Sequence, residues 1–201
     1  MKRLLLIGLL ALAAPCLAAQ TPPSGPRLPV RVSYRILNAQ SLVPADFTVL
    51  FAPNARAARV NFTGESGYVI VDMASHQMTM VLDQPAISFA IPTPAQLALI
   101  FDWRRDLSFA RGPRSSIAGH DCTYWTMSGT QGRGRVCFTA DGVPLRIEAA
   151  GKNGTSTTIE ASTAIATNYD PAEFQVPADH TPLNTSGFNL SPFVALGLGN
   201  P

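Results

Sequence analysis

Short segments in which apolar and polar residues alternate recur along the chain between residue 30 and about residue 166. In the first of them, Val30, Val32 and Tyr34 point one way while Arg31 and Ser33 point the other. A period of two is typical of strands that bury one face. Similar segments follow at 57–62, 68–73, 76–82 and 86–91, separated by turn-forming residues. The pattern predicts a mainly β domain built as a curved antiparallel sheet, an incomplete-barrel meander.

One helix is expected to interrupt this sheet and to pack on its concave face. Thr93-Pro94-Ala95-Gln96 has the spacing of a capping box, with proline at the first helical position. Leu97, Ile100 and Phe101 then lie along one helical stripe, which predicts a helix to about Asp106. An Arg-rich loop is expected to follow, with strands resuming near Ile117.

Cys122 and Cys137 are placed symmetrically about Gly129-Thr130. If a four-residue loop, 128–131, connects two strands there, the two cysteines oppose each other directly. Opposed residues in an antiparallel pair have Cα atoms ~4.5–5.5 Å apart, a separation that a disulfide tolerates. The spacing therefore predicts a cross-strand disulfide.

The strands after the cysteines can be aligned from their turns. The first register opposes Tyr124 to Arg135 and Trp125 to Gly134. The Asp141-Gly142 turn opposes Arg135 to Glu148, Phe138 to Leu145 and Val136 to Ile147, and a three-residue loop at 152–154 opposes Ile147 to Ile159 and Arg146 to Glu160. One face then collects Trp125, Val136, Phe138, Leu145, Ile147 and Ile159. The other collects Tyr124, five charged residues (Arg133, Arg135, Arg146, Glu148 and Glu160) and both cysteines. The disulfide is therefore expected on the wet face, outside the core.

The first 19 residues predict an export signal. Lys2 and Arg3 precede an apolar run from Leu4 to Ala14, and small residues allow cleavage after Ala18 or Ala19. This run is too short to span a bilayer, and Pro15 beside Cys16 disfavours lipidation at that cysteine. We therefore expect a periplasmic or secreted protein, in which a disulfide is the default state of the remaining cysteine pair.

Removal of Lys2 and Arg3 leaves 13 basic and 13 acidic residues, a balance that gives no reason to expect a nucleic-acid partner.

The remaining chain divides into three parts by composition. Residues 20–29 form a Pro-rich leader, 30–176 a single antiparallel β domain, and 177–201 an irregular C-terminal tail.

The stretches Gly119–Trp125 and Val136–Arg146 carry a resemblance. A cysteine followed by Asp-Gly and then Leu-Arg resembles the pattern of uncharacterised exported bacterial proteins with a fold like the lipoprotein carriers LolA and LolB. Those carriers are incomplete antiparallel barrels whose concave face, covered by helix and loop, can hold acyl chains. The resemblance implies a hydrophobic small molecule or lipid as ligand. The residues expected to line its site are Trp125, Phe138, Ile147, Phe101 and Trp103.

Three other groups of residues could take part in metal binding, catalysis or lipid contacts, and each also has a structural interpretation. His76, Met78 and Met80 share one face of a predicted strand and offer the soft ligands that suit Cu(I), although methionines commonly fill irregular cores. His120 and Cys122 lie two residues apart, but a disulfide removes that nucleophile. The arginines between 104 and 114 and at 133, 135 and 146 are positioned either to meet lipid headgroups or to form a solvated face.

The sequence favours an exported, non-enzymatic envelope protein that needs no cofactor and binds a hydrophobic or lipid-like ligand. Two alternatives stay open, a periplasmic Cu(I)-binding module that uses His76, Met78 and Met80, and a purely structural envelope protein.

Overall fold

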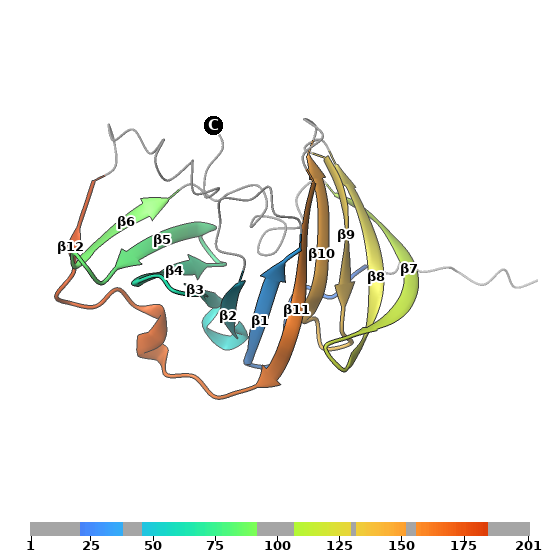
Figure 1. Ribbon diagram of the computed structural model, residues 1–201, viewed down its shortest axis with the longest axis horizontal. Helices are drawn as coiled ribbons and strands as arrows, with labels where there is room; N and C mark the ends of the chain where they lie inside the picture. Colours follow the sequence, from blue (N-terminus) through green and yellow to red (C-terminus); the bar gives the residue numbers. More distant parts are fainter. Residues whose placement is uncertain (1–20, 38–45, 92–106, 130–131, 152–155, 185–201) are drawn as a thin grey trace, which may run out of the picture.

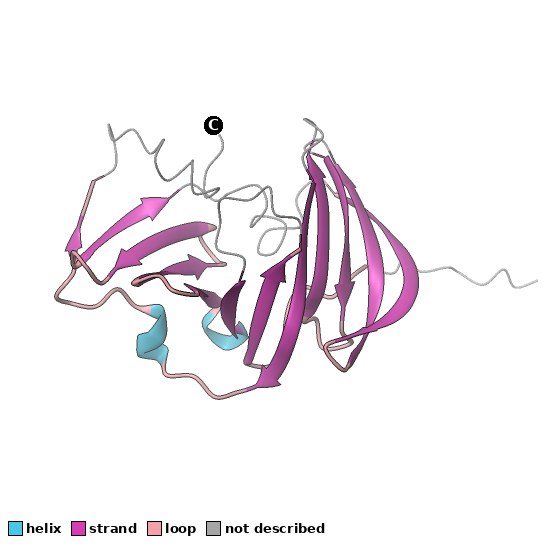
Figure 2. Ribbon diagram, in the orientation of Figure 1, coloured by secondary structure: helices cyan, strands magenta, loops and turns pink. Residues whose placement is uncertain are grey.

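The computed structural model describes residues 21–37, 46–91, 107–129, 132–151 and 156–184. The described residues form one open, curved sheet of twelve strands with almost no helix (Figure 1, Figure 2). The elements are β1 (Val30–Ile36), β2 (Asp46–Ala52), η1 (Pro53–Ala55), β3 (Ala57–Phe62), β4 (Gly67–Asp72), β5 (Gln77–Leu82), β6 (Ile87–Ile91), β7 (Ser108–Ile117), β8 (His120–Gly129), β9 (Gly132–Phe138), β10 (Pro144–Gly151), β11 (Ser156–Ala166), η2 (Pro171–Phe174) and β12 (Thr181–Pro182).

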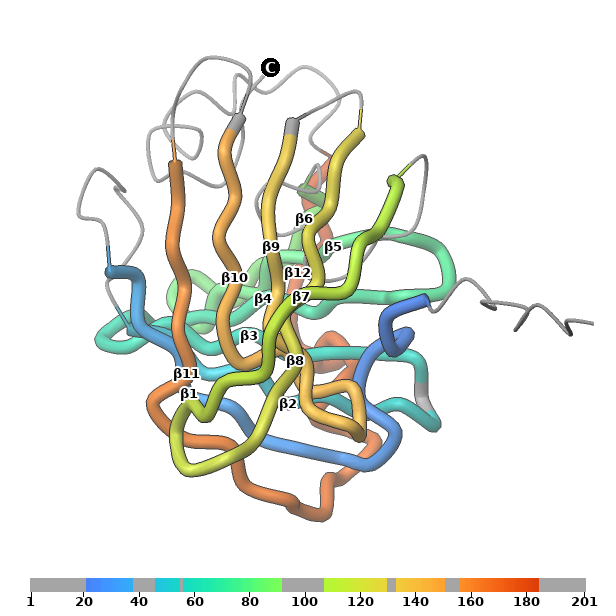
Figure 3. Tube along the Cα trace, turned by 90° about the vertical axis from the view of Figure 1, so that its right-hand side faces the viewer, coloured from blue at the N-terminus to red at the C-terminus, as the bar shows by residue number. Residues whose placement is uncertain are grey.

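Two meanders make up this sheet, and the first strand joins them. Along the sheet the order is β12-β6-β5-β4-β3-β2-β1-β11-β10-β9-β8-β7. Strands β2 to β6 form one wing and β7 to β11 the other, and β1 pairs antiparallel with β2 on one side and with β11 on the other. The second wing curls strongly, since residues of β7 and β11 come within 8 Å of one another. In Figure 3 this wing stands in front, with β3 to β5 crossing behind it.

The predicted fold class is confirmed, but several predicted boundaries are wrong. Strands β2 and β12 were not predicted. The expected Arg-rich loop is strand β7 over most of its length, because the ladder resumes after a register shift between Arg111 and Arg114. Such a bulge at the sheet edge accommodates Gly112 and Pro113 without ending the pairing. The helix expected up to Asp106 lies outside the described residues, as do the export signal, Cys16 and the loop at 152–154.

Apart from the two cysteines, the main core lies on one face of the sheet, which we call the inner face. Both wings contribute buried side chains to it, including Val60 and Met80 from one and Trp125 and Leu145 from the other. Tyr34 crosses this face from β1, and its hydroxyl donates a hydrogen bond of 2.6 Å to the Pro144 carbonyl at the start of β10. The Tyr34 side chain thus spans the width of strand β11, which lies between β1 and β10. This is possible because neighbouring strands are only ~4.8 Å apart and the sheet curves toward its inner face.

The opposite, outer face carries a small second cluster, formed by Tyr68, Ile70 and Val81. The Arg59 guanidinium lies 3.5 Å from the centroid of the Tyr68 ring and donates to the Glu173 carbonyl. The C-terminal segment from β11 through η2 to β12 therefore runs along the outside of the first wing (Figure 1), and β12 attaches in parallel to the edge strand β6.

Candidate ligand pocket beneath β7 to β9

The pocket forms where the N-terminal leader passes the inner face of β7, β8 and β9. It has a volume of about 700 Å³, which lies within the ~300–1,000 Å³ typical of small-molecule sites. Its lining residues, from the leader, the three strands and the turn after β9, are Thr21, Pro22, Pro23, Ser24, Arg27, Arg111, Arg114, Asp121, Cys122, Thr123, Trp125, Phe138, Thr139 and Ala140.

Aromatic side chains form the apolar part of this pocket. Trp125 and Phe138 are 6 % and 4 % exposed and belong to the inner-face core. The register places them on one face, because Trp125 opposes Val136, and Phe138 opposes Thr123. Both side chains therefore belong to the core and also line the pocket.

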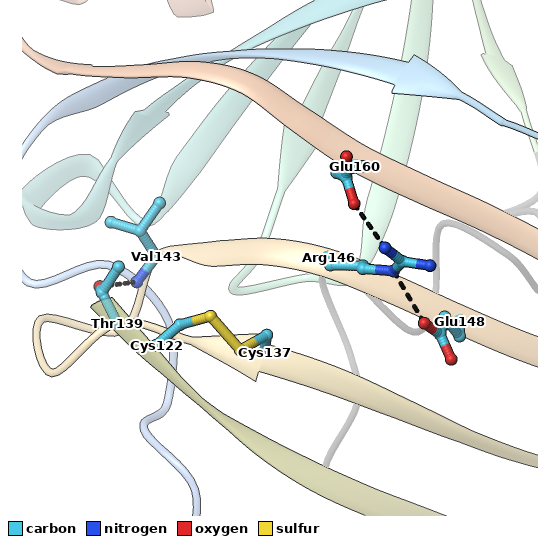
Figure 4. Close-up of a disulfide and its surroundings, with 7 residues drawn as sticks. All are labelled: Cys122, Cys137, Thr139, Val143, Arg146, Glu148 and Glu160. Atoms are coloured by element: carbon cyan, nitrogen blue, oxygen red, sulfur yellow. Dashed lines mark hydrogen bonds and ion pairs between the residues drawn. A yellow bond between two sulfur atoms is a disulfide. The ribbon is translucent and has the colours of Figure 1, made fainter. Parts of the chain in front are cut away.

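The leader is held against the β9–β10 turn by backbone contacts. The Arg27 amide donates a hydrogen bond of 2.9 Å to the Asp141 carbonyl. Gly142, with a backbone φ of +84°, lies so close to the leader that a Cβ atom there would collide with the Gly25 carbonyl. Thr139 closes the turn, because its hydroxyl accepts a hydrogen bond from the Val143 amide (Figure 4). Segments far apart in sequence thus form one wall.

The disulfide ties the strands at the same end of the wing. Cys122 and Cys137 are bonded, with Cα atoms 5.4 Å apart, as predicted (Figure 4). The predicted register is wrong by two residues. Gly129 pairs with Gly132, and Tyr124 instead of Cys122 opposes Cys137, so that the disulfide runs diagonally across the ladder. Because a shift of two residues leaves every side chain on its face, the alternation alone did not distinguish the two registers.

The expected exposure of the disulfide is also wrong, since Cys122 is 4 % exposed and Cys137 is fully buried. The register still places Cys137 on the outer face, between Tyr124 on β8 and Arg146 on β10. The cysteine side chain is much smaller than the tyrosine and arginine side chains on either side of it. Tyr124 and Ile117 are half-buried and pack against the core cluster that contains both cysteines. A small side chain between large ones on the same face is thereby covered.

The rest of the predicted ladder is mostly confirmed. Ile147 opposes both Val136 and Ile159, Glu148 opposes Arg135, and Arg146 opposes Glu160. The predicted pair Phe138–Leu145 is wrong, because a bulge sets Pro144 opposite Phe138 and leaves Leu145 out of the pairing. Leu145 is nevertheless fully buried.

Charged side chains next to the disulfide form a network on the outer face (Figure 4). Arg146 donates to Glu148 at 2.7 Å and to Glu160 at 2.6 Å, and Arg135 donates to both Glu148 oxygens. The hydrogen bond from Arg135 holds the pKa of the Glu148 carboxyl below its usual range. These arginines are therefore compensated by carboxylates.

The predicted site residues do not all meet. Trp125 and Phe138 lie together at the pocket, while Ile147 lies on the same inner face, 2 % exposed and outside the pocket lining. Phe101 and Trp103 lie outside the described residues. The sequence did not single out the leader and Arg27 as part of this site, because their proximity depends on contacts between distant segments.

The residues of the copper alternative are distributed differently. Met78 and Met80 are 1 % and 6 % exposed in the inner-face core. His76, expected at the start of the strand, instead occupies the preceding turn with a φ of +57° and is exposed, since β5 begins at Gln77. Among the described residues, no group of three or more histidine, cysteine, aspartate or glutamate side chains is arranged to hold a metal ion.

An open, curved antiparallel sheet with an apolar inner face defines the class of fold. The structure of MucB matches 78 % of this chain and 60 % of its own length at 12 % identity, with a TM-score of 0.50. The chain thus spans about three fifths of the MucB structures it matches, and at this identity the likeness shows the fold alone.

Two further structures are similar at lower scores. MucB in complex with MucA(peri) has a TM-score of 0.49 at 12 % identity and covers 80 % of this chain and 58 % of its own. A putative outer membrane lipoprotein-sorting protein domain from Vibrio parahaemolyticus has a TM-score of 0.41 at 10 % identity and covers 76 % of this chain and 90 % of its own. No family model and no curated protein matches the sequence. Membership of the expected family of uncharacterised exported proteins therefore stays a prediction.

Proposed function

We propose that the protein is an exported, non-enzymatic binding protein that holds a hydrophobic or lipid-like ligand at the inner face of its sheet. The observation that carries this proposal is the pocket of about 700 Å³, which Trp125 and Phe138 of the inner-face core help to line. Trp125 and Phe138 supply aromatic surface to this pocket, and polar or charged side chains make up the larger part of its lining. Small-molecule sites combine apolar surface with polar groups that fix the orientation of the ligand.

Export is supported by the disulfide, because such bonds persist in oxidising compartments. Within the described part of the chain, no helix is both long enough and apolar enough to cross a bilayer.

Native mass spectrometry of the protein isolated from the periplasm tests this proposal. We expect an adduct with the mass of a lipid or another hydrophobic molecule, retained under gentle ionisation. In Phe138→Leu, a change that preserves an apolar core, the occupancy of this adduct is expected to fall, because the pocket loses aromatic lining. The matched control is Arg133→Ala, an exposed side chain on the outer face of β9, which is expected to keep the adduct.

The same spectra separate the alternatives. A protein that carries no adduct after several gentle preparations would contradict ligand binding and favour a structural envelope role. A Cu(I) adduct that disappears in Met78→Ala would instead support the copper-binding alternative.

A further inference from the structure

The arginines of β7 stand beside the aromatic floor of the pocket. In the ladder between β7 and β8, Arg111 opposes Trp125 and Arg114 opposes Thr123. The bulge at Gly112 and Pro113 lies between them and keeps both arginines on the inner face. Both are exposed and line the pocket. Two positively charged side chains therefore lie on the same face of the sheet as the aromatic residues of the pocket, at its solvent-exposed rim.

A third arginine comes from the leader. Arg27 lines the pocket from the leader, and Asp121 is the one carboxylate among the lining residues. In the described part of the chain, the guanidinium groups of Arg27 and Arg114 form no salt bridge. Arg135 and Arg146 of the outer face differ, because Glu148 and Glu160 compensate them. At the pocket, three arginines thus lie with a single carboxylate, that of Asp121.

From this arrangement we infer that the pocket binds a single-chain anionic amphiphile, an apolar chain that ends in a carboxylate or a phosphate. The chain lies against Trp125 and Phe138, and the anionic head lies at the rim among Arg27, Arg111 and Arg114. This inference rests on the proposed function and names its ligand class. Arginine suits the head, because its planar guanidinium presents paired donors that match carboxylate and phosphate oxygens.

The pocket is complete only when the leader lies against the β9–β10 turn. It supplies one wall and one arginine, and its attachment at Asp141 and Gly142 is made mainly by backbone contacts. A ligand head at Arg27 would therefore bridge the leader and β7 and strengthen the closure of the pocket.

Isothermal titration of the delipidated protein with decanoate, decyl phosphate and decanol tests the inference. The three probes share one chain and differ in the head. We expect decanoate and decyl phosphate to bind about tenfold or more tightly than decanol, because each charge-assisted hydrogen bond contributes on that order. The comparison of the two anions shows whether a carboxylate or a phosphate head fits better. Added NaCl is expected to weaken the binding of the anions and leave decanol unchanged, a readout that needs no variant.

Arginine variants localise the effect. Arg111→Gln with Arg114→Gln is expected to abolish the preference for the anions, so that decanoate and decyl phosphate bind no more tightly than decanol. Arg133→Ala, an exposed arginine outside the pocket, is the matched control and is expected to keep the full preference.

Three results would overturn the inference. If all three probes bind equally in every variant, the arginines do not select the head, although the proposed function survives. If inorganic phosphate binds as tightly as decyl phosphate, the site is an anion site without a chain. If no probe binds, both the inference and the proposed function fail for single-chain ligands.

Discussion

At the scale of single residues, one buried hydroxyl connects the centre of the sheet to the second wing. Tyr34 is 1 % exposed, and its burial raises the pKa of the phenol far above the ordinary value, so that it acts as a neutral donor. Its partner is the Pro144 carbonyl at the β10 bulge, and its ring stacks on Phe47 with centroids 5.3 Å apart. Alternation predicted that Tyr34 points inward, but its partner 110 residues away depends on the curvature of the sheet.

Replacement of Tyr34 by phenylalanine removes the donor and leaves the ring. We expect the free energy of unfolding to fall by about 1–3 kcal/mol, because a buried carbonyl loses its partner. Urea denaturation measures this change. Tyr124→Phe is the matched control, since the Tyr124 side chain is only half-buried, and it is expected to change stability by less than about 0.5 kcal/mol. Equal losses in the two variants would contradict the role of the Tyr34 hydrogen bond.

The carboxylate of Glu148 predicts a pH dependence. Its pKa is lowered by the hydrogen bond from Arg135, so its contribution to stability is present above the unfolded pKa, near 4.5, and is lost as pH falls through the lower folded value. In Glu148→Gln we expect the melting temperature to depend less steeply on pH below about 5, with a stability loss at pH 7 of about 1 kcal/mol. Calorimetric scans between pH 3 and pH 7 measure this, and identical pH profiles would contradict it.

At the scale of elements, local patterns predicted the strands better than their exact partners. Turn residues set the registers of β9 to β11 almost completely, because a one-residue slip there exchanges the faces. The turn residues did not define the register between β8 and β9. There, a four-residue loop and a two-residue connection between Gly129 and Gly132 fit the sequence equally well, and the structure has the second. Strand β7 was missed, since Gly112 and Pro113 are typical of loops and the edge bulge that accommodates them has no sequence signature.

The disulfide between β8 and β9 closes a loop over a separation of 15 residues. The double variant Cys122→Ala/Cys137→Ala is expected to lose about 3 kcal/mol of stability under oxidising conditions, because the unfolded chain is no longer constrained. Urea denaturation with and without a reductant measures the effect. The variant is expected to be insensitive to the reductant, whereas the native protein should approach it on reduction. A native protein with two free thiols after periplasmic expression would contradict the assignment.

The attachment of the leader predicts an asymmetry between two glycines. Gly142 and Gly119 both have positive φ, +84° and +77°, but only Gly142 has neighbours that a Cβ atom would meet. Alanine at Gly119 should cost about 1 kcal/mol from backbone strain alone. Alanine at Gly142 should cost more and should also expose the Arg27 amide to solvent. Hydrogen exchange at Arg27, with Gly119→Ala as control, checks this, and unchanged protection in Gly142→Ala would contradict the contact.

At the scale of the whole molecule, the fold depends on a pairing that the sequence did not indicate. Each meander follows from consecutive strands, but β1 pairs with β11 across more than a hundred residues and joins the two wings. No local pattern identifies the partner of a central strand. The candidate pocket was likewise predicted only in part. Trp125 and Phe138 followed from alternation and resemblance, whereas Arg27 and the leader required the assembled sheet.

In the proposed function, the inner face beneath β7 to β9 holds the apolar chain of a ligand. An NMR titration of the isotopically labelled protein with decanoate tests it most directly, because amide shifts report where the ligand binds. We expect the changes to centre on Thr123, Trp125 and Phe138, with the leader amide of Arg27, while Glu148 and Thr158 of the outer face stay unchanged. Changes confined to the outer face, or an absence of change at the pocket during saturable binding, would contradict it.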